Sequence, residues 1–256
     1  MSIQIWRLAL LVAIVAVWEG SVRSGLLDPF WMSSPSLIYD RTLELLADGS
    51  LLYHTGVTLS EAFAGLAAGI VVGVALGLLL GVSPIIGRIV EPFIMALNSL
   101  PRVALAPLLV LYAGIGFASK FLLAFSLVVV IIMVNTFEGV KTIDPKLINA
   151  MRILGAGRIA IFTKVLLPAC VPWILAGIRV STSFAIVGAI VGEFISSQAG
   201  IGYMIDNASG AYDTTGIMVP LFVLMIGGLA IDVIIQIVTR YLLRWRSAQH
   251  GAAARG

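Results

Sequence analysis

The sequence predicts an all-α polytopic membrane protein with about six transmembrane helices. Of its 256 residues, 60% are hydrophobic and only 11% are charged, and the mean hydropathy is +1.07. Soluble domains carry about 25% charged residues, so this composition lies far outside their range. The apolar residues also gather into long runs separated by polar segments, which is the pattern of successive membrane spans.

Composition and motifs exclude several classes of function. An isoelectric point near 9.2 reflects a net charge of only +3, and basic residues gather on one side of a membrane, so we expect no nucleic-acid partner. The single cysteine, Cys170, excludes an internal disulfide and a cysteine metal site. The chain has no HExxH, GxSxG or Walker A pattern. We therefore expect no catalytic site, metal or cofactor on this chain, and any ATP that drives it would be hydrolysed by another chain.

The first span is predicted over residues 3–18, where Gln4 and Arg7 are the polar exceptions. A cleaved signal peptide is the alternative, but residues 17–19 make a poor cleavage site, so we expect the helix to be retained. Residues 21–60 form the longest polar connection. Within it, residues 37–47 predict an amphipathic helix that Gly49 ends, either lying on the membrane surface or packed as a connector.

The second span, residues 62–82, contains a row of glycines on one helix face. They are spaced four residues apart, at Gly65, Gly69, Gly73, Gly77 and Gly81. Such a row lets another backbone come close, which is a main source of helix association in lipid. Static packing and a sliding face used in gating are both compatible with this pattern.

The third span is predicted to be broken, because Pro101 and Pro107 interrupt the apolar stretch from Arg88 to Ala113. Arg102 lies beside the break, where it could attract an anion or cap the broken helix. The remaining spans are expected over residues 121–135, 173–194 and 217–241, with a polar loop over residues 196–216. Glu193 ends the fifth span, and Arg102 and Glu193 are the candidates for a translocation path.

The basic residues predict the orientation of the chain. With six spans both termini share one side, and eleven Lys or Arg residues then lie on the side of the termini against three on the other. The positive-inside rule places the termini and residues 144–168 in the cytoplasm. The loop 196–216, which has two Asp and no Lys or Arg, faces outward.

Residues 144–168 predict a short cytoplasmic hairpin. Asp144 is suited to cap a helix and Pro145 to its first position. An apolar face is predicted at helical spacing from Leu147, Ile148, Met151 and Leu154. Gly155 and Gly157 predict a left-handed stop and a sharp turn, and a second segment leads back to Pro168. A short helix with an apolar face suits a groove on a partner protein.

This segment resembles the EAA motif of ABC-importer permeases. The motif has Glu-Ala-Ala, three residues, Gly, nine residues, an aliphatic residue, one residue and Leu-Pro. Asn149, Ala150 and Met151 stand at its first three places, followed at the right distances by Gly155, Val165, Leu167 and Pro168. Asn149 replaces Glu and Met151 replaces Ala, and Asn149 can donate or accept a hydrogen bond but carries no charge for a salt bridge to a partner. Residues 101–116, 172–185, 192–205 and 227–245 are similar to the nitrate/sulfonate/taurine-type permeases.

The resemblance implies a type I importer of the bacterial inner membrane. Residues 61–246 would be the permease core, preceded by an N-terminal helix with its connection in 1–60 and followed by a flexible tail, 247–256. Implied partners are a second permease copy, two cytoplasmic ATPases that bind ATP and Mg, and an extracytoplasmic binding protein. The coupling residues would be Asn149, Ala150, Met151, Arg152, Leu154, Gly155, Ala156 and Arg158. The cargo would be a small anion or organic solute, such as nitrate, a sulfonate, taurine, bicarbonate or a vitamin precursor.

Two other classes compete with this interpretation. A stand-alone secondary transporter or channel would suit six spans with intramembrane charges, but it would not need a motif-spaced cytoplasmic hairpin, and the chain shows no convincing inverted repeat. A membrane-embedded enzyme would need a catalytic cluster, which the sequence lacks. Arg179 resembles an arginine found widely in these permeases, so we expect a structural or interfacial role for it, and likewise for Asp232.

Overall fold

A computed structural model describes residues 3–243 of the chain, and within this range the regular structure is helical throughout. The predicted tail, 247–256, and Arg244, Arg246 and Arg255 lie outside the described residues. The elements, in order, are α1 (Ile3–Arg23), α2 (Pro29–Met32), α3 (Pro35–Ala47), α4 (Ser50–Val82), α5 (Pro84–Ser99), η1 (Arg102–Leu105), α6 (Ala106–Ala113), α7 (Phe117–Lys141), α8 (Pro145–Ile153), α9 (Arg158–Ile161), η2 (Phe162–Leu166), α10 (Leu167–Ile195), α11 (Ile201–Gly210) and α12 (Thr214–Leu242).

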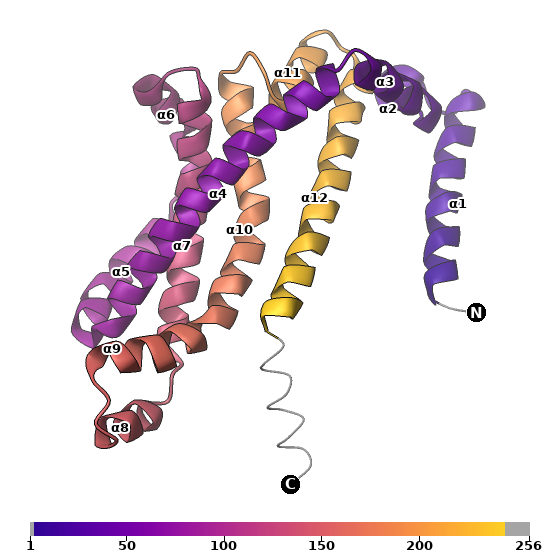
Figure 1. Ribbon diagram of the computed structural model, residues 1–256. Helices are drawn as coiled ribbons and strands as arrows, with labels where there is room; N and C mark the ends of the chain where they lie inside the picture. Colours follow the sequence, from indigo (N-terminus) through magenta and orange to yellow (C-terminus); the bar gives the residue numbers. More distant parts are fainter. Residues whose placement is uncertain (1–2, 244–256) are drawn as a thin grey trace.

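Among the described residues, five helical segments could span a membrane, or six if one bent helix pair is counted as a single span. The five segments are α1, α4, α7, the continuous stretch from α9 to α10, and α12. That pair is α5 with η1–α6, which bends by 76° between Ser99 and Arg102, where Pro101 was predicted to break the helix, whereas Pro107 lies in the first turn of α6. In Figure 1 the start of α1 and the end of α12 lie on the same side as α8 and α9, and α2, α3 and α11 lie on the opposite side.

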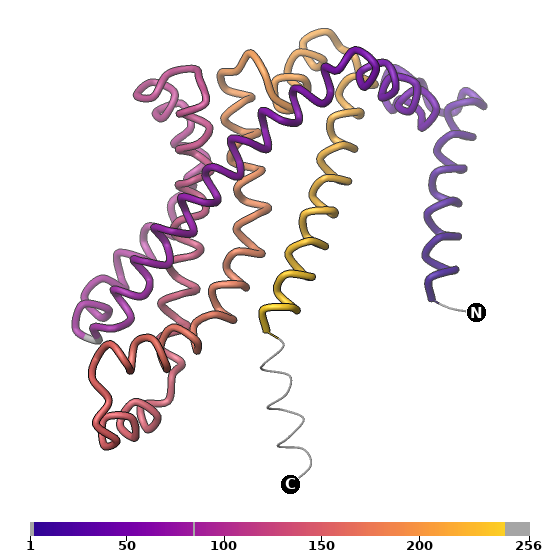
Figure 2. Tube along the Cα trace, in the orientation of Figure 1, coloured from indigo at the N-terminus to yellow at the C-terminus, as the bar shows by residue number. Residues whose placement is uncertain are grey.

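The core is the bundle of α4, α7 and α10, which pack against one another (Figures 1 and 2). Its buried apolar centre is formed by Ala62, Leu66, Val128, Ile132, Ala185 and Ala189. The glycine row of α4 faces α7 throughout. A Cβ built on Gly65 would lie 2.6 Å from the Cβ of Ala124, and one on Gly77 would lie 2.6 Å from the carbonyl oxygen of Met133. The absence of side chains is therefore what lets the two backbones approach.

A second cluster holds the peripheral helices together at the end of the bundle opposite α8. Ile38 of α3, Leu51 of α4, Ile201 of α11 and Val219 of α12 are buried against one another. Trp18 of α1 stacks on Phe222 of α12 with ring centroids 6.2 Å apart, and both pack on this cluster. Away from it, the apolar side chains of α1 and α12 are exposed, as expected for helices that face lipid or another chain.

Three element boundaries differ clearly from the predicted ones. The loop predicted over residues 196–216 contains the helix α11, whose Ile201 and Ile205 are buried one turn apart. The second span was expected to begin at residue 62, but α4 begins at Ser50. Its first three turns are rich in polar residues because His54 and Thr58 bind the backbone that leads into α11. These polar groups contact another segment of the same chain, and the hydropathy pattern alone does not reveal such a contact.

The fifth span also begins earlier than predicted. A π-helical turn, η2, joins α9 to α10, so the helix runs on past Pro168. Pro168 has no N–H to donate to the preceding turn, and a widened π turn is one way to accommodate such a defect. The second segment of the hairpin, α9, therefore continues through η2 into the fifth span, α10, without a break in the helix.

Candidate functional site

The α8–α9 hairpin is built from local backbone signals. The Asp144 carboxylate accepts the Lys146 N–H at 2.8 Å and so caps the start of α8. At the other end, Gly155 has φ +78°, and the N–H groups of Gly155 and Ala156 donate to the carbonyls of Arg152 and Met151 at 3.0 and 2.9 Å. This pair of bonds is a Schellman motif. It fixes the direction in which the chain leaves α8.

The predicted apolar face of α8 divides into two parts in the structure. Ile148 and Met151 pack, with Ala156, onto a cluster that contains Val140 of α7 and Cys170 of α10. Leu147 and Leu154 are exposed instead, at 52% and 81%. The prediction that all four residues form one face for a partner is therefore wrong, because the bundle covers Ile148 and Met151. The hairpin is held firmly and still presents an apolar outer surface.

Sequence reasoning missed two members of this outer surface. Ile153 is 86% exposed and Ile159 is 81% exposed, and with Leu147 and Leu154 they form what we call the hairpin tip. The predicted coupling residues Asn149, Ala150, Arg152, Gly155 and Arg158 are also exposed. Isolated exposed apolar residues are normal, but four on a short hairpin that projects from the bundle indicate a contact surface (Figure 1).

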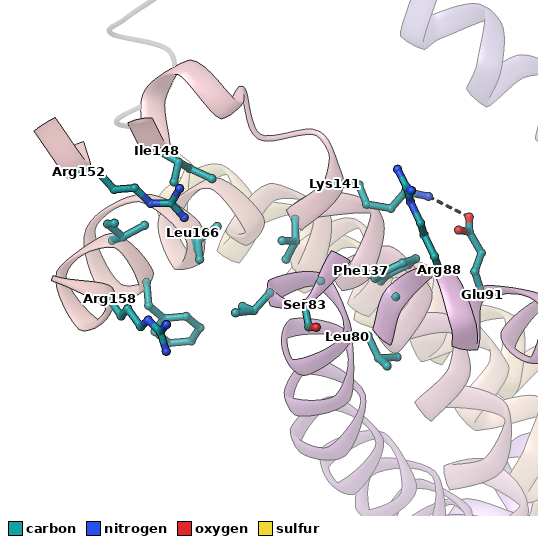
Figure 3. Close-up of a pocket in the computed structure, with 16 residues that line it drawn as sticks. Leu80, Ser83, Arg88, Glu91, Phe137, Lys141, Ile148, Arg152, Arg158 and Leu166 are labelled. Atoms are coloured by element: carbon teal, nitrogen blue, oxygen red, sulfur yellow. Dashed lines mark hydrogen bonds and ion pairs between the residues drawn. The ribbon is translucent and has the colours of Figure 1, made fainter. Parts of the chain in front are cut away.

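A cavity of about 820 Å³ lies between the hairpin and the bundle (Figure 3). The hairpin contributes Arg152 and Arg158, and the bundle contributes Arg88 and Lys141. Lys141 donates to Glu91 at 2.9 Å and to Glu138 at 3.2 Å. The hairpin thus joins the bundle through a basic, partly open space as well as through the apolar cluster.

Arg102, at the broken third span, is 9% exposed and makes structural hydrogen bonds. Its guanidinium donates to the carbonyls of Leu97, Ser126 and Leu127 at 3.1–3.4 Å and to the side chain of Asn98 at 3.1 Å. These contacts tie the end of α5 to α7 where the backbone lacks regular helical bonds. The sequence left two roles open for Arg102, attracting an anion and capping the broken helix. These hydrogen bonds agree with the capping role. Contact with solute stays a prediction.

Glu193 is 1% exposed and organises the opposite end of the bundle. It accepts the Thr58 hydroxyl at 2.7 Å and the Gly202 N–H at 2.5 Å, so it joins α4, α10 and the start of α11. Thr58 in turn accepts the N–H of Ile201 at 2.7 Å. Next to it, the buried Lys120 ammonium donates to the carbonyls of Ile115 and Ser196. A path role for Glu193 stays a prediction, and its observed contacts fix the outer loops.

Arg179 and Asp232 form the link between α10 and α12. Arg179 Nε lies 3.0 Å from Asp232 Oδ1, and Nη2 lies 3.3 Å from Oδ2. Gln236 also donates to Asp232 at 2.6 Å. This bidentate geometry agrees with the structural role expected for both charged residues.

A family model described as "binding-protein-dependent transport system inner membrane component" matches residues 65–247. The chain belongs to this family. The riboflavin transport system permease protein RibX of Chloroflexus aurantiacus is 35% identical over 238 residues, covering 93% of this chain and 89% of that protein. The taurine transport system permease protein TauC of Escherichia coli strain K12 is 26% identical over 240 residues, covering 92% and 87%.

The fold of the binding-protein-dependent permeases is also found among solved structures. An inward-facing conformation of the MetNI methionine ABC transporter matches with a TM-score of 0.67 and 21% identity, covering 75% of this chain and 96% of that chain. The predicted family and fold, an ABC-importer permease of type I, are thus confirmed. The chain is a multi-pass transport subunit of the inner membrane.

Proposed function

We propose that the α8–α9 hairpin is the coupling element through which a cytoplasmic ATPase moves this permease. One observation carries the proposal: a rigidly capped hairpin packs on α7 and α10 by its inner face and leaves the apolar hairpin tip uncovered. A protein that transmits a push needs a stiff element with one face fixed and one face free. The stand-alone transporter that we considered has no use for such an element.

Each predicted coupling residue has a place in this scheme. Leu154 supplies apolar docking area, and Asn149 and Ala150 lie on the exposed part of α8. Met151 and Ala156 make the closing hydrogen bond of the Schellman motif and pack inward. Gly155 has a left-handed backbone conformation, which glycine adopts without strain because it has no Cβ. Arg152 and Arg158 lie beside the tip and line the cavity that separates the hairpin from the bundle.

The remaining parts of the transporter follow from the family and the charge distribution. We infer that the hairpin and both termini are cytoplasmic, that two permease copies pair with two ATPase subunits, and that an extracytoplasmic binding protein delivers the solute near α11. ATP and Mg belong to the ATPase subunits, and this chain binds no cofactor. The cargo is a small anion or a small organic solute, a class supported by relatives named for taurine and riboflavin.

Reconstitution in liposomes tests the proposal. The permease is coexpressed with candidate ATPase and binding-protein partners and reconstituted. Vesicles in which the hairpin faces the lumen should take up solute only when the lumen contains ATP. Transport by the lone chain without ATP would overturn it.

A pair of matched variants tests the hairpin tip. Leu154→Gln removes an apolar side chain that is 81% exposed, and Leu26→Gln removes one that is 80% exposed on the opposite side of the bundle. Burying a leucine contributes about 1.5–3 kcal/mol, so Leu154→Gln should weaken ATPase binding by about tenfold or more. Leu26→Gln should leave it unchanged. Equal effects of the two substitutions on ATPase affinity would exclude the hairpin tip as the docking surface.

A further inference from the structure

The cavity between hairpin and bundle contains more positive charge than its single acidic residue can balance. Four basic side chains line it, and Glu91 is the one carboxylate among the lining residues. Glu91 is paired with Lys141. Among residues 3–243, the guanidinium groups of Arg88, Arg152 and Arg158 have no hydrogen-bond or ion-pair partner. Three guanidinium groups around one space form a site for an oxyanion, because guanidinium matches phosphate geometry in a bidentate manner.

The same cavity has an apolar wall. Leu80, Phe137, Val140, Ile161, Phe162 and Leu166 line it beside the basic groups. A small inorganic anion would gain nothing from this wall. A ligand with an anionic head and a hydrocarbon tail would satisfy both parts, since apolar surface that leaves water stabilises binding.

The position of the cavity identifies the source of such a ligand. Arg88 lies in α5, six residues after the end of α4 at Val82, and Lys141 is the last residue of the spanning helix α7. The ends of spanning helices lie at the headgroup level of the bilayer. Ile85 and Ile89, on either side of Arg88, are 73% and 62% exposed, so the surface beside the cavity is suited to face lipid.

We propose that this cavity binds one anionic phospholipid, with its anionic headgroup among the basic side chains that line the cavity and an acyl chain against the apolar wall. Figure 3 shows Arg152 and Arg158 on the hairpin side and Arg88 and Lys141 on the bundle side. The lipid would bridge the hairpin to the start of α5. It would thereby balance the charge that otherwise repels the hairpin from the bundle.

Native mass spectrometry of the full-length chain in detergent tests this proposal, with and without its ATPase. Phosphatidylglycerol is compared with phosphatidylcholine of the same acyl chains and with soluble glycerol phosphate. Phosphatidylglycerol should be retained preferentially, and glycerol phosphate should not bind detectably. Each basic residue beside an anionic headgroup contributes about fivefold, so Arg88→Gln should reduce the preference about fivefold and Arg88→Gln/Arg158→Gln about 25-fold.

Arg240→Gln is the matched control, because Arg240 lies in the last turn of α12 on the same side of the bundle and outside the cavity. It should retain the full preference, and thermal unfolding should show that all variants are folded. Equal binding of both lipids, or an equal loss in Arg240→Gln, would overturn the proposal. Binding of glycerol phosphate as tight as that of the lipid would reassign the cavity to a free anion. Displacement of the lipid by the ATPase would reassign it to the protein interface.

Discussion

Replacing a glycine of the α4 row by alanine should destabilise the bundle, and the structure gives the size of the effect. A Cβ on Gly77 would lie 2.6 Å from the carbonyl oxygen of Met133, whereas ordinary contact begins at 3.4 Å. Helices α4 and α7 would therefore have to separate locally by about 0.8 Å, since the obstructing atom is backbone and cannot rotate away. A gap of that size forfeits a quarter to a half of the dispersion energy across the contact.

The expected change in unfolding free energy combines two opposing contributions. Overpacking costs about 1–3 kcal/mol, and replacing glycine by alanine in a helix interior returns about 0.5–1 kcal/mol. Gly77→Ala should therefore destabilise by up to about 2.5 kcal/mol. Gly56→Ala is the control on the same helix, because a Cβ there meets nothing within 4 Å. That variant should be stabilised by about 0.5–1 kcal/mol.

Thermal unfolding monitored through Cys170 is a direct assay. This cysteine, the only one in the sequence, is 0% exposed, so a thiol-reactive fluorophore labels it when the bundle opens. A difference of about 2 kcal/mol between Gly77→Ala and Gly56→Ala corresponds to a difference in midpoint of about 4–8 °C. Equal midpoints for the two variants would refute the claim that the glycine row sets the distance between α4 and α7.

Two further substitutions test charged contacts. Glu193→Gln should speed hydrogen exchange at Gly202 and along α11, because an amide offers one acceptor where the carboxylate satisfies two donors. Unchanged exchange would show that Glu193 does not hold α11. Arg179→Asp and Asp232→Arg should each lower the unfolding midpoint, and the doubly exchanged variant should recover part of the loss. A double variant no more stable than the single ones would show that the ion pair does not join α10 to α12.

Local signals allowed much of the fold to be predicted from the sequence. The spans follow from apolar runs, and the break near Pro101 follows from the ring geometry of proline. The start of α8 at Asp144 and its stop at Gly155 depend on the residues themselves, because a side-chain cap and a left-handed glycine act within a few positions of the chain.

Features that depend on distant contacts were not predictable in this way. The helix α11 lies in a stretch with turn-forming residues, and its first N–H groups are satisfied by Glu193 and Thr58 from other helices. The polar first turns of α4 have the same cause. No periodicity within residues 50–61 or 196–210 shows that the two segments bind each other.

The candidate site shows the same division. Helical spacing placed four apolar residues on α8, but only the packed structure shows that the bundle covers Ile148 and Met151 and leaves Leu147 and Leu154 exposed. Ile153 and Ile159 are apolar residues at unremarkable positions in the sequence. Their exposure results from where the hairpin docks. The basic cavity is also invisible in the sequence, because Arg88 and Arg158 are seventy residues apart.

The contacts of the hairpin explain how a displacement at one end of the bundle would reach the other. Met151 packs on a cluster that contains Val140 of α7 and Cys170 of α10, and η2 makes the hairpin continuous with α10. Helix α7 is in turn in close contact with α4, because the glycine row lets α4 lie against α7 without intervening side chains. At the far end, Glu193 of α10 holds both α4 and α11. Under the proposed function, an ATPase that moves the hairpin therefore moves the surface around α11 as well, and no separate relay is needed.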